Sequence, residues 1–93
     1  MNIHFLPDAE TGLPHIWVEH GVTQLEVREV FRNPGEDLPG DPGTRIRIAS
    51  TDAGRILKII YKREPRNCVF VITGYDLPRK QLKAYRRRRR GKT

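Results

Sequence analysis

The chain has 93 residues, with 18 Lys and Arg against 11 Asp and Glu, and 37% of its residues are hydrophobic. This length allows one domain with a modest core, and the composition excludes a collagen, a disulfide-rich scaffold and a membrane-spanning protein. The charge is uneven: residues 1–43 carry two arginines and eight acidic residues, whereas residues 44–93 carry sixteen basic and three acidic residues. This asymmetry predicts a polyanionic partner, most commonly nucleic acid, although an anionic membrane surface or an acidic protein would fit as well.

The first half of the chain predicts a short strand followed by two helices. Residues 3–6 suit a strand, and residues 13–20 suit a short helix that ends at a glycine. Thr23 is a favourable cap for the second helix, and Glu26 stands three residues later, where it completes a capping box. The second helix must end before Pro34.

A segment rich in Pro and Gly follows, over residues 33–43. It neither continues a helix nor suits a central strand, so we expect a long exposed loop. The part before this loop is too short for a core of its own. We therefore expect residues 1–93 to form a single domain.

The second half predicts strands over residues 45–48, 55–62 and 68–75, because apolar residues alternate along the first two and fill both faces of the third. Short turns join them into an antiparallel meander. A final helix begins at Leu77-Pro78 and leads into a basic tail over residues 86–93. We expect an α+β fold, with two N-terminal helices and a C-terminal helix around a small, three- to four-stranded, mostly antiparallel sheet.

Strand alternation predicts a cationic sheet face. If the apolar residues of the first two strands of the meander face the helices, then Arg45, Arg47, Lys58 and Lys62 share the open face. A phosphate backbone would relieve the repulsion among them. Lys and Arg are also ordinary on the solvent-exposed face of an antiparallel sheet, so alternation alone leaves both interpretations open.

A second group of cations lies near the C-terminus: Lys83, Arg86, Arg87, Arg88, Arg89 and Arg90. Each phosphate that such residues neutralise releases counterions, so this group is expected to dominate a salt-sensitive affinity for RNA. The alternative is a solvated helix end, where cations are favourable without any ligand.

No motif for nucleotide binding or serine hydrolysis occurs. No Cys or second His stands at metal-ligand spacing, so we expect neither a metal nor another cofactor, and His20 is expected to cap a helix end. Cys68 is the single cysteine and no signal peptide is visible, which predicts a location in the reducing cytoplasm.

RNA cleavage needs none of these motifs, because the 2′-hydroxyl can attack its own neighbouring phosphate once the backbone is aligned and a proton is moved. The candidate catalytic residues are those that offer a positive charge or a phenol near the predicted open face. They are Arg45, Lys58, Lys62, Tyr75 and Arg79. Arg47 and the C-terminal cations are candidates for RNA binding.

Several short blocks of the sequence match a known pattern. They are His-Gly-Val at 20–22, Val-Phe-Arg-Asn-Pro at 30–34, Thr-Arg at 44–45, Gly-Arg-Ile-Leu-Lys-Ile-Ile-Tyr at 54–61 and Lys-Ala-Tyr-Arg-Arg at 83–87. In this order and spacing they resemble the BrnT-like toxins of the RelE/ParE toxin superfamily. The sequence departs from that family in the third strand of the meander, where Phe70 and Tyr75 stand in place of two arginines.

The resemblance implies a RelE-like fold and the toxin of a type II toxin–antitoxin system. Such a toxin is an mRNA endoribonuclease, ribosome-dependent or free, that inhibits translation and is neutralised by a cognate antitoxin protein. The two departures leave a sister family open, and fold does not settle function. The alternatives are a non-catalytic RNA- or ribosome-binding protein and a gyrase-directed toxin.

Overall fold

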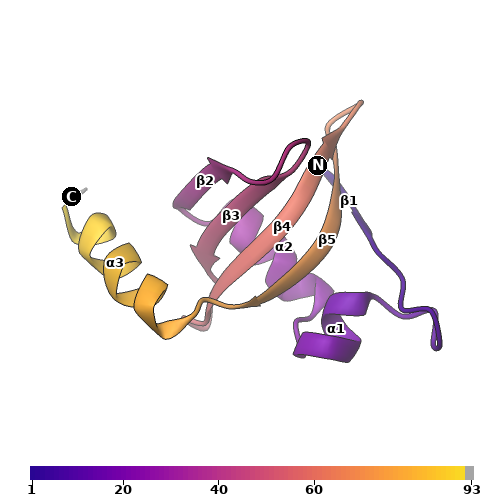
Figure 1. The fold of residues 1–93 in the computed structure, drawn as a ribbon, viewed down its shortest axis with the longest axis horizontal. Coiled ribbons are helices and arrows are strands. Elements are labelled where there is room, and N and C mark those ends of the chain that lie inside the picture. The colour runs from indigo at the N-terminus through magenta and orange to yellow at the C-terminus, as the bar shows by residue number, and fades with distance from the viewer. Residues whose placement is uncertain (92–93) are drawn as a thin grey trace.

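The computed structural model describes residues 1–91. In chain order the elements are β1 (Asn2–Phe5), α1 (His15–His20), α2 (Gln24–Arg32), β2 (Gly35–Pro39), β3 (Arg45–Ser50), β4 (Ile56–Glu64), β5 (Cys68–Asp76) and α3 (Arg79–Arg90). Figure 1 shows α1 and α2 on one side of the sheet, while α3 leads away from the end of β5 toward β2 and β3. These residues form a small α+β domain.

The sheet has five strands in the order β1-β5-β4-β3-β2. β1 runs parallel to β5, and the other neighbours are antiparallel. The predicted RelE-like sheet of three to four mostly antiparallel strands is therefore wrong, because the sheet is mixed and one strand is added at each edge of the meander. β1 pairs with a strand far along the chain, which no local turn could reveal, whereas β2 forms a hairpin with β3 through the short turn at residues 40–44.

The segment 33–43, predicted to be an exposed loop, contains the edge strand β2. Pro34 precedes the strand and Pro39 ends it, opposite Arg45. Proline is tolerated there because an edge strand has a neighbour on one side only. The prediction excluded a central strand and then assigned the segment to a loop, without considering an edge strand.

Gly35 allows β2 to lie close to β3. A Cβ atom at this position would collide with the backbone of Ile48 and lie 2.6 Å from the Cβ of Ala49. We expect Gly35→Ala to lower the free energy of unfolding by about 1–3 kcal/mol, measured by urea denaturation. Gly91→Ala is the control, since its Cβ would meet only ordinary contacts at 3.6 Å. Equal stability of the two variants would contradict the close pairing of β2.

The main core lies between the sheet and the first two helices. Ile59 of β4 is fully buried against Val27 and Val30 of α2 and their neighbours. α2 begins with the predicted capping box: the Thr23 hydroxyl accepts a hydrogen bond from the Glu26 amide, and the Glu26 carboxylate accepts one from the Thr23 amide. We call this side of the sheet the α1/α2 face.

The opposite side, the α3 face, has a smaller core. Ile48 of β3 packs there with Leu77 and with Tyr85 of α3. The helix continues to Arg90, so the tail predicted over residues 86–93 is helical up to that residue. Residues 92–93 lie outside the described part of the chain.

Candidate nucleic-acid interface

The α3 face carries the two candidate lysines of β4. Leu57, Ile59 and Tyr61 of this strand are buried in the α1/α2 core. Because successive strand residues point to opposite faces, Lys58 and Lys62 lie on the α3 face, as the alternation of β4 predicts. They are separated by about 13 Å along the strand, so the structure does not make them neighbours in one site.

Arg45 and Arg47 lie on the α1/α2 face, and their predicted place beside these lysines is wrong. Arg45 pairs with Tyr61 and Arg47 pairs with Ile59, and residues paired across strands share a face. The isoleucines of β3 pack on the α3 side instead. The prediction assumed that helices cover one face only. Helices lie over both faces, so the apolar side of β3 can turn to either.

Arg45 belongs to a polar cluster that joins β2, β3 and β4. Its Nε donates to the Asp37 carboxylate at 2.6 Å, and the Tyr61 hydroxyl donates to the same carboxylate. The hydrogen bond with Asp37 raises the pKa of Arg45, while burial and Asp37 raise the pKa of Tyr61. Arg45 is thus bound internally and is removed from the candidate catalytic set.

Arg47 caps the C-terminal end of α2. Its guanidinium donates to the main-chain oxygens of Val30 at 3.1 Å and Asn33 at 2.5 Å. Cations are favourable at this end of a helix because the last carbonyl groups lack helical partners. The predicted RNA-binding role of Arg47 is therefore replaced by a structural one.

We expect Arg47→Ala to lower the free energy of unfolding by about 1–2 kcal/mol, because two carbonyl groups lose their donor. RNA affinity should not change, since the side chain points away from the α3 face. Urea denaturation and an RNA-binding titration measure the two quantities. Arg28→Ala serves as the control, because Arg28 is an exposed arginine of α2, the helix that Arg47 caps. A loss of RNA affinity in folded Arg47→Ala would contradict this assignment.

Lys58 and Tyr75 face each other across neighbouring strands. They are paired in the β4–β5 register, and the Lys58 ammonium donates to the side-chain oxygen of Gln81 in α3 at 3.1 Å. The Tyr75 ring packs edge-on against the imidazole of His20, with 5.7 Å between the ring centroids. Tyr75 is thus the neighbour of Lys58 across the sheet and the ring partner of His20 from α1.

His20 was not among the predicted catalytic residues. It is the last residue of α1, as the sequence indicates, and the next residue, Gly21, adopts the left-handed conformation. Its ring contact with Tyr75 joins residues 55 positions apart in the chain. No local spacing signals such a contact, so sequence reasoning could not find it.

The cations of α3 divide into two groups. Arg88 forms an ion pair with Glu36 of β2, with Nε 2.7 Å from the carboxylate, and Arg89 donates to the main-chain oxygen of Gly35. These two arginines hold α3 against the edge strand. The other α3 cations named in the sequence analysis are exposed: Arg79, Lys83, Arg86, Arg87 and Arg90.

A hollow of about 510 Å³ lies between α3 and the strand ends beside it. Arg86, Arg89 and Arg90 line it together with Tyr85 and Ile56. Burial raises the pKa of the Tyr85 phenol, which therefore stays neutral at physiological pH. Cations around an apolar floor suit a phosphate backbone and its bases.

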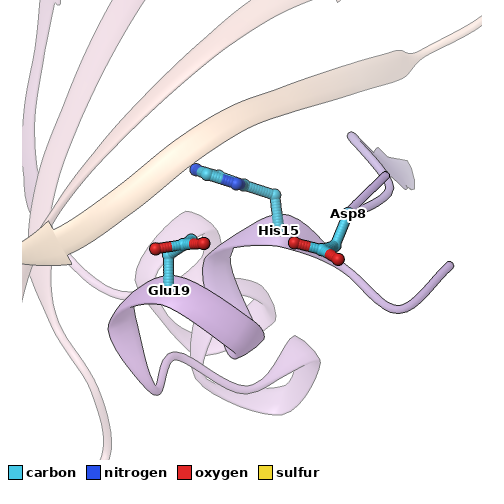
Figure 2. A group of neighbouring side chains, drawn as sticks. All are labelled: Asp8, His15 and Glu19. Atoms are coloured by element: carbon cyan, nitrogen blue, oxygen red, sulfur yellow. The ribbon is translucent and has the colours of Figure 1, made fainter. Parts of the chain in front are cut away.

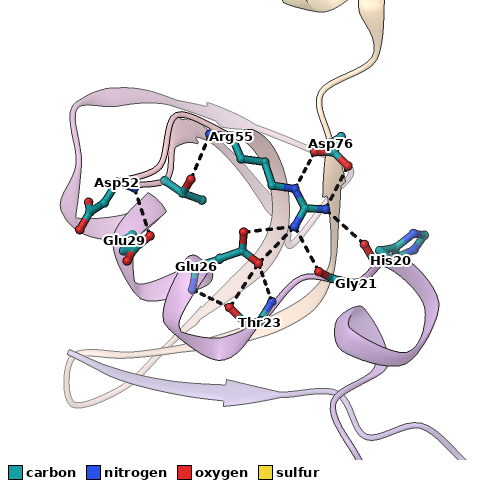
Figure 3. A network of polar contacts seen from close by, with 9 residues as sticks. His20, Gly21, Thr23, Glu26, Glu29, Asp52, Arg55 and Asp76 are labelled. Carbon is teal, nitrogen blue, oxygen red and sulfur yellow. Dashed lines mark hydrogen bonds and ion pairs between the residues drawn. The ribbon is translucent and has the colours of Figure 1, made fainter.

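Arg55, just before β4, is the centre of a polar network that includes the main chain of His20 and the side chain of Asp76 (Figure 3). Its guanidinium makes two hydrogen bonds to Asp76 at 2.7 and 3.0 Å, and it also bonds Glu26 at 3.1 Å. Further bonds reach the main-chain oxygens of His20 and Gly21. This one side chain thereby joins the ends of α1 and β5 and the start of α2. Its contact with Asp76 holds the pKa of that carboxyl below its usual range.

No family model matches the chain, and neither the search of curated proteins nor the search of solved structures returns a match. Among the described helices, none combines the length and the apolar character that a bilayer crossing requires.

Proposed function

We propose that this protein is the toxin of a type II toxin–antitoxin system and acts in the cytoplasm as an mRNA endoribonuclease. The observation that carries the proposal is the position of Tyr75, which pairs with Lys58 across the sheet and contacts the His20 ring, while Lys58 itself bonds Gln81 of the cationic helix α3. The resemblance of its sequence blocks to the BrnT-like toxins supports the same function.

The proposed reaction is metal-independent attack of a ribose 2′-oxygen on the adjacent phosphorus. The bond from phosphorus to the 5′-oxygen breaks, which leaves a 2′,3′-cyclic phosphate and a 5′-hydroxyl. His20 and Tyr75 are the groups suited to take the 2′-proton and to protonate the leaving oxygen. The Lys58 ammonium stabilises the negative charge that develops on the phosphate.

RNA would be held by the exposed side of α3. Arg86, Arg87 and Arg90 can neutralise phosphates without giving up the contacts that Arg88 and Arg89 make to β2. A cognate antitoxin of acidic character would compete for these cations and so block the access of RNA.

Induced expression in a bacterium, combined with mapping of RNA 5′ ends, tests this function. We expect growth arrest and new mRNA ends that carry a 5′-hydroxyl. Co-expression of an acidic protein encoded beside this gene should prevent both effects. Normal growth without new RNA ends, at confirmed expression of folded protein, would overturn the proposal.

A non-catalytic RNA- or ribosome-binding protein is the second candidate. It is favoured by the internal contacts of Arg45 and Arg47, which leave fewer cations around Lys58 than the sequence predicts. Replacing Arg86, Arg87 and Arg90 by glutamine distinguishes the two functions. A binding protein should then lose its only activity, whereas an enzyme at high concentration should still cut RNA slowly.

A further inference from the structure

Three potential metal ligands meet beside α1. One ligand atom each from Asp8, His15 and Glu19 lies within 4.8 Å of the other two. Figure 2 shows the three side chains gathered over α1, with Asp8 on the segment that precedes the helix. His15 and Glu19 are four residues apart on one helix, which places them on the same side. The spacing of Cys and His residues alone does not reveal this set, because two of its three ligands are carboxylates.

The backbone holds Asp8 in place relative to the helix. The Asp8 amide donates to the oxygen of Leu13 at 2.7 Å, and the His15 amide donates to the oxygen of Leu6 at 2.8 Å. A bridge between Pro7 and Pro14 closes the same turn. Main-chain contacts therefore bring the carboxylate and the imidazole together.

The Asp8 side chain is also oriented. Its Oδ1 atom accepts hydrogen bonds from the amides of Glu10 and Thr11, each at 3.0 Å, and from the Thr11 hydroxyl at 3.2 Å. The hydrogen bonds of the described residues leave the Oδ2 atom without a donor. Outer hydrogen bonds of this kind commonly orient a metal-binding carboxylate and leave its other oxygen for the ion.

We propose that Asp8, His15 and Glu19 form a binding site for a divalent first-row transition metal, with Zn²⁺ as the reference ion. An imidazole with two carboxylates is a donor set that zinc accepts, with bonds of about 2.0–2.2 Å. Such bonds place ligand atoms roughly 3–4 Å apart, so the group must contract by about 1 Å. Glu19 is exposed and can rotate to close that distance.

The ion would stabilise a short helix that begins without a side-chain cap. α1 has six residues, and Pro14 at its start supplies no side-chain capping hydrogen bond. A metal that joins His15 and Glu19 spans one turn of α1, and Asp8 ties that turn to the preceding loop. The His15 ring also contacts His20, with 5.8 Å between the ring centroids. Metal binding would thus fix the helix that carries His20.

Calorimetric titration of the purified protein with Zn²⁺ tests the site and does not depend on any activity toward RNA. We expect one ion per chain, and we expect His15→Gln and Glu19→Gln to weaken binding by more than about tenfold. His4→Gln is the matched control, because His4 also lies beside a carboxylate, 3.5 Å from Glu64, but outside the group of three. Circular dichroism confirms that each variant is folded.

A second measurement needs no variant. Substoichiometric Mn²⁺ should broaden the amide NMR signals around Asp8, His15 and Glu19 more than those around His4. The proposal would be overturned if His4→Gln weakened Zn²⁺ binding as much as His15→Gln does. It would also be overturned if the NMR broadening were centred on residues away from Asp8, His15 and Glu19. The absence of saturable Zn²⁺ binding to the wild-type protein would overturn it as well.

Discussion

Lys58→Ala is expected to slow RNA cleavage by about 100-fold while leaving the free energy of unfolding nearly unchanged. The ammonium is the positive charge that the structure places opposite Tyr75, so its loss removes the stabilisation of the charge on the phosphate. Its described hydrogen bond is to the exposed Gln81 side chain, and breaking such a bond costs little stability. Single-turnover cleavage of a labelled RNA and urea denaturation measure the two effects.

Two variants serve as controls for this result. Arg28→Ala removes an exposed cation from α2, on the other side of the sheet, and should cleave RNA at the wild-type rate. Gln81→Ala removes the partner of Lys58 but keeps the ammonium, so its effect should be small. Folded Lys58→Ala that cleaves RNA as fast as Arg28→Ala would show that the reaction occurs elsewhere.

Local features of the fold could be predicted because their signals are local. The capping box of Thr23 and Glu26 is a contact across three residues, and the alternation along β4 continues through Lys62. The first edge strand was predicted over residues 3–6, but its pairing gave no local signal, and the second edge strand was not predicted. β1 pairs with β5 about 66 residues later in the chain, as Asn2 with Cys68, and β2 lies in a segment whose prolines suggest a loop.

The candidate site could be predicted only in part, for a related reason. Alternation tells which residues of a strand share a face, but it does not tell which face is covered by which helix. For β4 the buried side is the α1/α2 face, and Lys58 turns away from it as the alternation predicts, but onto a face that α3 partly covers rather than an open one. For β3 the apolar side lies under α3, so Arg45 and Arg47 turn to the opposite face. A prediction that allowed helices on both faces would not have decided on which face these two arginines lie.

The largest loss of stability is expected for Arg55→Ala, at about 2–4 kcal/mol. The side chain of Arg55 is 29% exposed and that of Glu26 is 22% exposed, so water replaces the lost hydrogen bonds only in part. Asp76 is 65% exposed, which limits the cost on that side. Urea denaturation of Arg55→Ala measures the effect, and Arg28→Ala, an exposed arginine outside the network, should unfold like the wild type.

Arg55→Lys separates charge from geometry. Lysine keeps the positive charge but lacks the planar fork that makes two bonds to one carboxylate and still reaches Glu26. We therefore expect it to recover less than half of the stability that Arg55→Ala loses. Full recovery by lysine would mean that a point charge is enough and that the pattern of hydrogen bonds around Arg55 contributes little.

The same network predicts how stability depends on pH. Burial raises the pKa of Glu26, but hydrogen bonds from Thr23 and Arg55 outweigh this effect, so its pKa lies below the usual 4.5. Hydrogen bonds from Arg55 likewise lower the pKa of Asp76 below its usual 3.8. A carboxyl with a depressed folded-state pKa stabilises the fold above its unfolded value, and this contribution is lost as the pH falls through the folded value. The wild-type protein should therefore lose stability as the pH drops below about 4.5. Arg55→Ala should show a shallower decline over that range, because its carboxyls no longer differ as much between the two states. Equal slopes would mean that Arg55 does not set these pKa values.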